Sequence, residues 1–177
     1  HVFVHDRTTG KTERVSKHSD GTEGDSYSFR SSISDNGRYV AFNSNSSNLV
    51  DDDTNDEPDI FVHNRRTGKT ERVSKRSNGI QGNSYSFEPS ISANGRYVAF
   101  ESYATNLVDN DTNGEKDIFV HDRETGKTTR VSKHSNDDEG DASSGDPSIS
   151  KNGRIVAFES DATNLVDNDT NGEQDIF

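Results

Sequence analysis

The sequence predicts an all-β protein built as a β-propeller from repeated four-stranded sheets. One 58-residue pattern recurs without insertion or deletion, so that Phe3, Phe61 and Phe119 stand at the same position of successive copies. Residues 59–116 and 117–174 are identical at 42 of 58 positions. No segment keeps helical periodicity over about ten residues, whereas short runs rich in β-branched and aromatic residues alternate with turn residues. About three blades therefore fill the chain.

Each copy of the repeat contains four predicted strands. Read from the second copy into the third, they cover residues 89–92, 96–102, 117–122 and 128–132. Asn94 and Gly95 predict a tight hairpin between the first two, because both residues adopt positive φ readily. The third strand has apolar side chains on both faces, with Phe119 on one side and Ile118 and Val120 on the other. Sheets covered on both faces can pack radially against their neighbours, as propeller blades do.

The polarity of the outer strands predicts their place in a blade. Ile91 is the only large apolar residue of the first strand, which suits an innermost position, and the polar fourth strand suits the rim. The chain starts and ends within a third strand, so a segment of a longer propeller, a ring of two chains joined head to tail, and an open-ended fibre all stay possible. The expected partner is itself or another protein. One propeller segment, 1–177, then contains the repeats 1–58, 59–116 and 117–174.

Three motifs resemble the blade of TolB-like β-propellers. They are the segments 89–100, 117–122 and 126–132. The family pattern has Asp in the hairpin turn, where this chain has Asn36, Asn94 and Asn152, and Ser31 replaces a Pro in the first copy. Neither departure changes the expected fold, since Asn adopts positive φ as readily as Asp. The resemblance implies a six-bladed or similar propeller that serves as a binding or scaffold module, sometimes attached to an enzyme domain.

A nine-residue acidic loop between the second and third strands is the clearest chemical motif. Its pattern, Asp-x-Asp-x-Asn-Gly-x-x-Asp, places side-chain oxygens at positions one, three, five and nine. Alternating oxygen donors on a tight loop are typical of calcium sites, and the spacing resembles the calcium loops of integrin-type propellers. The predicted ligands are the side chains of Asp51, Asp53, Asn55, Asp59, Asp109, Asp111, Asn113, Asp117, Asp167, Asp169, Asn171 and Asp175 and the backbone carbonyls of Glu57, Glu115 and Glu173.

The first copy of this loop has Asp56 where the others have glycine, and we expect a weaker site there because Asp tolerates positive φ. The alternative interpretation is an acidic turn in which Asp and Asn only cap the backbone. Without the twelfth-position Glu of an EF-hand, affinities of about 10⁻⁴–10⁻³ M are expected. Calcium outside the cytoplasm would fill such sites, so the sequence predicts an extracellular, cell-surface or periplasmic protein stabilised by Ca²⁺.

Composition argues against several functions. A net charge of -12 disfavours nucleic-acid binding, and no apolar run is long enough for membrane insertion. With no cysteine, disulfides and thiolate catalysis are excluded. No nucleophile elbow, phosphate-binding glycine loop or HExxH motif is present, and therefore we expect no enzyme.

Aromatic residues before the first strand form a second candidate site. Tyr27, Phe29, Tyr85 and Phe87 occur there in two copies and are absent from the third. They either bind a ligand or partner, as surface aromatics often do, or pack locally onto their blade. The sequence thus predicts a non-catalytic, calcium-stabilised extracellular interaction module. The alternatives are a self-assembling ring or fibre subunit and a ligand-binding accessory domain of a larger secreted enzyme.

Overall fold

The computed structural model describes all of residues 1–177 as β-strands joined by turns and loops, with no α-helix. It contains no helix that could cross a membrane. The strands are β1 (Phe3–Asp6), β2 (Lys11–Arg14), β3 (Ser28–Ile33), β4 (Tyr39–Ser44), β5 (Asp59–Asn64), β6 (Lys69–Arg72), β7 (Ser86–Ile91), β8 (Tyr97–Ser102), β9 (Asp117–Asp122), β10 (Lys127–Arg130), β11 (Ser144–Ile149), β12 (Val156–Ser160) and β13 (Asp175–Ile176).

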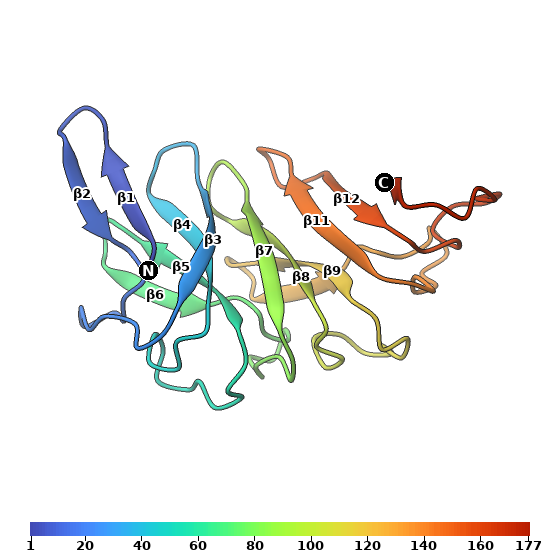
Figure 1. Ribbon diagram of the computed structural model, residues 1–177, viewed down its shortest axis with the longest axis horizontal. Coiled ribbons are helices and arrows are strands. Elements are labelled where there is room, and N and C mark those ends of the chain that lie inside the picture. Colours follow the sequence, from blue (N-terminus) through green and yellow to red (C-terminus); the bar gives the residue numbers. More distant parts are fainter.

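The strands form four separate antiparallel sheets. Two are complete four-stranded blades, β3-β4-β5-β6 and β7-β8-β9-β10, and they are flanked by the sheets β1-β2 and β11-β12-β13. Figure 1 shows the four sheets following one another along the long axis of the molecule in sequence order. The all-β architecture of repeated four-stranded blades is thereby confirmed.

The first strand of each blade lies innermost, as its polarity predicts. β3, β7 and β11 are neighbours although they belong to different sheets. The backbone N–H of Ile91 donates to Ser32 Oγ and that of Ile149 donates to Ser90 Oγ, each at 3.1 Å. A serine hydroxyl in the first strand of one blade therefore accepts a hydrogen bond from a backbone N–H in the first strand of the next blade. A large apolar side chain could not make this bond.

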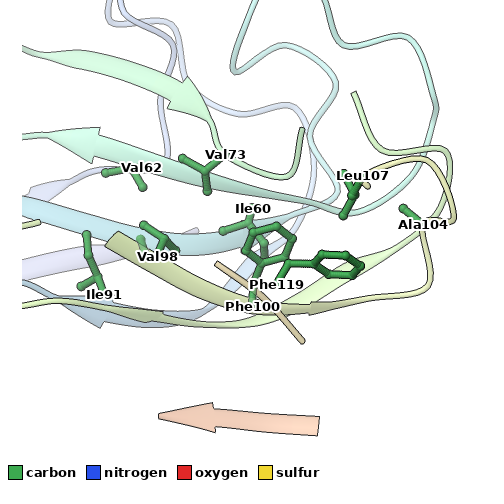
Figure 2. Packing of buried hydrophobic residues seen from close by; sticks show 10 residues of the cluster. Ile60, Val62, Val73, Ile91, Val98, Phe100, Ala104, Leu107 and Phe119 are labelled. Carbon is green, nitrogen blue, oxygen red and sulfur yellow. The ribbon is translucent and has the colours of Figure 1, made fainter. Parts of the chain in front are cut away.

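The hydrophobic core lies between blades and not within them. Phe61 of β5 faces the β1-β2 sheet, where it packs with Val2 and Val15. Its neighbours in β5 point the opposite way, so alternate residues of the third strand face opposite blades, as predicted. The cluster between the two complete blades (Figure 2) consists of Ala41, Ile60, Val62, Val73, Ile91, Val98, Phe100, Ala104, Leu107 and Phe119.

The first strand differs from the prediction in its length. β7 covers Ser86–Ile91 instead of 89–92, and its pairing with β8 shifts register between Phe87 and Ser90. Glu88, inside this β-bulge, has a φ of 46°. A bulge inserts an unpaired residue into a strand, and this irregularity hid the first half of the strand from the alternation pattern.

Candidate functional site

An arginine stands among the carboxylates of the second acidic loop, between β8 and β9. Nη1 of Arg130, at the end of β10, lies 3.2 Å from Asp117 Oδ2 and 3.7 Å from Asp111 Oδ1. The same nitrogen lies 2.8 Å from Glu139 Oε2. The side chains of Arg130, Asp111 and Asp117 are all less than 10% exposed. Two predicted ligands thus converge, and they converge on a cation supplied by the chain itself.

The first acidic loop, between β4 and β5, repeats this arrangement with fewer carboxylates around the arginine. Nη1 of Arg72 lies 3.2 Å from Asp53 Oδ1 and 3.3 Å from Asp59 Oδ2. Its Nη2 donates to the backbone carbonyl of Asp52 at 2.8 Å. Gln81 stands where the second loop has a glutamate. One guanidinium therefore faces two carboxylates here and three in the second loop.

The asparagine at position five is held by hydrogen bonds on both sides of its amide. Asn113 Oδ1 accepts the backbone N–H of Glu115 at 2.9 Å. Its Nδ2 donates to the Gly140 carbonyl at 2.9 Å and to Asp117 Oδ2 at 3.3 Å. Asn55 makes the same three kinds of bond in the first loop. In this geometry the amide stabilises the turn and connects it to the next blade.

The carboxylates at position one lie apart from the others. They are exposed to solvent and pair with residues of the preceding connection between blades, not with the converged carboxylates. No group of three or more His, Cys, Asp or Glu side chains is placed to hold one metal ion in this geometry. The position-one pairs are Asp51 with His18, Asp109 with Arg76, and Asp167 with His134.

The third acidic loop retains only part of this network. Asn171 Nδ2 donates to Asp175 Oδ2 at 3.0 Å, and the N–H of Glu173 donates to Asn171 Oδ1 at 2.9 Å. Asp169 is partly exposed. In all three loops the glutamate whose backbone carbonyl is a predicted ligand stands two positions after the asparagine. Its backbone N–H donates to the side-chain Oδ1 of that asparagine.

Negative charge in the first two loops is incompletely compensated. Burial raises the pKa of Asp111 to about 6, with repulsion from Asp117 adding to it and Arg130 opposing it. Burial likewise raises the pKa of Asp59 to about 6 despite a hydrogen bond from Ser74. Asp111 Oδ1 is buried and accepts no hydrogen bond. Each of the two clusters therefore has more carboxylates than its single guanidinium balances.

Three residues of these clusters were missed by the sequence analysis, because they lie outside the nine-residue motif. Arg72 and Arg130 recur at one position of every copy, together with Arg14, and that repetition was an available signal. Glu139 lies in the stretch that differs most between copies, opposite Gln81, so only the folded chain connects it with the loop.

Two of the four aromatic candidates, Tyr85 and Phe87, lie in one cluster on the β7-β10 blade. The ring of Tyr85 lies 5.9 Å from that of Phe87 and 6.3 Å from that of Tyr103, both edge-to-face. Phe87 lies within β7, and not in a loop as predicted. Tyr103, which the sequence analysis missed, completes the cluster. Tyr27 is 79% exposed, and no ring pair connects it or Phe29 of β3 to these three rings.

Two histidines of the third strands are buried between blades. His121 Nδ1 lies 2.9 Å from Thr128 Oγ1, and that hydroxyl donates to the Lys75 carbonyl of the preceding blade. Nδ1 must therefore carry the proton. His63 repeats this geometry with Thr70. Burial lowers the pKa of each histidine to about 4, so both are neutral parts of the packing between blades.

Comparison with known proteins gives structural matches and no sequence matches: no family model and no curated protein matches the chain. TolB from Acinetobacter baumannii superposes with a TM-score of 0.56 at 17% identity, covering 98% of this chain and 33% of TolB. The tricorn protease gives 0.52 at 18% identity, covering 89% and 13%. Oligogalacturonate lyase from Vibrio parahaemolyticus gives 0.51 at 15% identity, covering 98% and 40%.

The class of protein follows from the repeated blades together with these matches: the chain has a β-propeller fold. TolB, whose blade the motifs of this chain resemble, is one of the propellers whose fold matches. At these identities the likeness concerns the fold alone. This chain spans less than half the length of each of the three proteins.

Proposed function

We propose that this chain forms part of a non-catalytic β-propeller that serves as a protein-interaction scaffold. The observation that carries the proposal is the cluster of Tyr85, Phe87 and Tyr103, in which the two tyrosines are 44% and 42% exposed and Phe87 is half-buried. Asn45 and Asp161 occupy the place of Tyr103 in the other copies, so only one blade presents all three rings. Exposed aromatic clusters are typical of interaction surfaces. Catalysis needs an acid, a base and a nucleophile at one place, whereas the repeats carry the same polar residues on successive blades.

Site-specific photo-crosslinking tests this surface. A photoreactive phenylalanine replaces Tyr103 in one variant and Asn45 in a matched control, and both are mixed with a cell-envelope extract. We expect a discrete protein adduct from position 103 that Tyr85→Ala abolishes and that the control lacks. Equal adducts from both positions would contradict the proposal. Binding to a glycan array without a protein adduct would instead support the accessory-domain alternative.

We further propose that the acidic loops bind Ca²⁺ and that the ion stabilises the fold. The supporting observation is the second loop, where one guanidinium faces Asp111, Asp117 and Glu139 and a buried carboxylate oxygen has no hydrogen-bond partner. These three carboxylates would hold the ion once Arg130 withdraws toward solvent. A bound divalent cation would neutralise the excess charge, and an ion that binds only the folded loop raises stability by linkage.

Calorimetric titration of the chelator-stripped chain with calcium tests this second proposal. Two or three ions per chain are expected, with the tightest in the second loop. Glu139→Gln should weaken that ion, and the matched change Gln81→Glu should tighten the one in the first loop, each by about tenfold or less. No heat and no rise in melting temperature would contradict calcium binding and leave the arginines as the only cations of the loops.

The proposal of calcium binding also bears on the location of the protein and on its self-association. Weak calcium sites would be filled outside the cytoplasm, which supports an extracellular, cell-surface or periplasmic location. A size measurement in calcium separates the assembly alternatives. A single sharp monomer contradicts both the ring and the fibre, a dimer supports the ring, and polydisperse growth with concentration supports the fibre.

A further inference from the structure

Near-identical blades raise the problem of how each one packs against its correct neighbour. The apolar residues that meet at the two junctions are largely the same, since Ile60 and Phe100 of one junction correspond to Ile118 and Phe158 of the next. Such packing cannot distinguish one blade from another. Any discrimination must come from polar contacts that differ between the junctions.

The junction between the β3-β6 and β7-β10 blades uses a neutral amide. Asn43 Nδ2 donates to the carbonyl of Ser86 at 2.7 Å and to that of Asp59 at 3.2 Å. The N–H of Ser86 donates to the Pro58 carbonyl at 2.9 Å. Asn43 is fully buried. Asn43 itself carries no charge, and the residue of β7 that follows Ser86 is the large Phe87. The one ion pair between β3 and β7 joins Arg30 Nε to Glu88 Oε1 at 3.0 Å.

The junction between the β7-β10 and β11-β13 sheets places an ion pair at the equivalent position. Glu101 replaces the asparagine, and its Oε2 lies 3.0 Å from Lys116 Nζ. The same oxygen accepts the N–H of Asp146 at 3.2 Å. The N–H of Ser144 donates to the Lys116 carbonyl at 2.7 Å. Glu101 is 7% exposed, so the lysine is its counter-ion in a site that is nearly closed to solvent.

A glycine makes room for this ion pair. Gly145 stands where the previous blade has Phe87, and a Cβ on it would lie 2.9 Å from Lys116 Nζ and 3.0 Å from Glu101 Oε2. Both atoms are the ends of flexible side chains, so an alanine needs only a small shift of the lysine, whereas a phenylalanine would need the space that the ion pair occupies. Expelling the lysine would leave the glutamate buried without its counter-ion, which is strongly destabilising.

We propose that these three positions form matched sets that select the neighbouring blade. Asn43 and Pro58 form a surface that fits a blade with phenylalanine in its first strand. Glu101 and Lys116 form a surface that fits a blade with glycine there. The inner core supplies affinity between blades, and the matched sets supply the order in which blades pack.

A cycle of substitutions in the whole chain tests the proposal through the midpoint of denaturant unfolding. Gly145→Phe alone and the pair Glu101→Asn with Lys116→Pro should each lower the midpoint. The triple variant transfers the complete set of the other junction and should recover most of the loss. If the effects were independent, the losses of unfolding free energy from Gly145→Phe and from the pair would add in the triple variant. We expect the triple variant to be more stable than that sum, with an unfolding constant at least about tenfold smaller.

The reciprocal transfer is the matched control. Asn43→Glu and Pro58→Lys should be destabilising beside Phe87 and tolerated beside Phe87→Gly. If Gly145→Phe does not fold, folding of the triple variant supports the proposal. If neither folds, Gly145→Ala is measured in the wild-type chain and in the Glu101→Asn, Lys116→Pro background. A larger cost of alanine beside the ion pair supports the proposal, and additive effects in either cycle overturn it.

Discussion

The two complete acidic loops share one sequence motif and differ in charge. Around Arg72 there are two carboxylates and the neutral Gln81. Around Arg130 there are three carboxylates, because Glu139 takes the place of the glutamine. Gln81 forms hydrogen bonds with Thr54 of the first loop, and Glu139 forms them with Thr112 of the second. The difference teaches that a residue more than twenty positions after the motif begins decides how many carboxylates surround the arginine.

Removing the arginine should have the largest effect on this comparison. In chelator, Arg72→Gln and Arg130→Gln should each destabilise the chain by about 3–5 kcal/mol, because buried carboxylates lose their counter-ion. The Arg130 variant should lose more, since three carboxylates then repel one another. Denaturant unfolding measures both. Calcium should restore more stability to the Arg130 variant than to the Arg72 variant, and equal losses without calcium would contradict the charge difference.

Acidification should affect the two blades alike. The folded-state pKa values of His63 and His121, about 4, lie below the ordinary value of 6.5. Their contribution is therefore complete above pH 6.5 and is lost as the pH falls toward 4. Lys75, Arg123, Glu71 and Asp122 also act on His121.

Unfolding free energy measured against pH tests this effect. His63→Asn and His121→Asn should each flatten the decline between pH 6.5 and 4 by the same amount. The change in slope is the measured quantity, because it is independent of the packing that each substitution costs. A decline that neither variant alters would show that other groups carry the acid sensitivity.

A smaller effect is expected from the serines beneath the loops. Ser132 Oγ donates to Asp117 Oδ1, and Ser74 Oγ donates to Asp59 Oδ1. Ser132→Ala and Ser74→Ala should each cost about 1–3 kcal/mol, since a buried carboxylate then loses a donor. Thermal unfolding in chelator measures the loss. A gain in stability from either change would show that the hydroxyl is not needed by the carboxylate.

The smallest effect should come from the position-one carboxylate. Asp109 is 80% exposed and pairs only with Arg76 at the surface, so Asp109→Asn should change stability by less than about 1 kcal/mol. The calcium affinity of the second loop in the Asp109→Asn variant should also stay close to that of the wild type. A large loss of affinity would mean that the loop rearranges around the ion and that all positions of the nine-residue motif take part.

The fold could be predicted almost completely from the sequence, because the strand pattern of one blade recurs in three copies of the repeat. The period fixed the blades, and the opposite faces of Phe119 and Ile118 placed the core between them. The candidate site could be predicted only in part. The motif located Asp111 and Asp117, whereas Arg130 approaches from another strand and Glu139 from a connection, and contacts between distant segments leave no local pattern.

The junctions between blades also bear on how such a chain can grow. Each cluster of the core takes residues from two successive sheets, with the larger share from the second. Any window of 58 residues contains every position of the repeat once, and therefore one copy of each of the two faces that meet at a junction. A tandem duplication of the gene therefore adds one whole junction without exposing an apolar face between the copies. Later substitutions at positions such as 101, 116 and 145 would then let the new copy pack against one neighbouring blade in preference to the others.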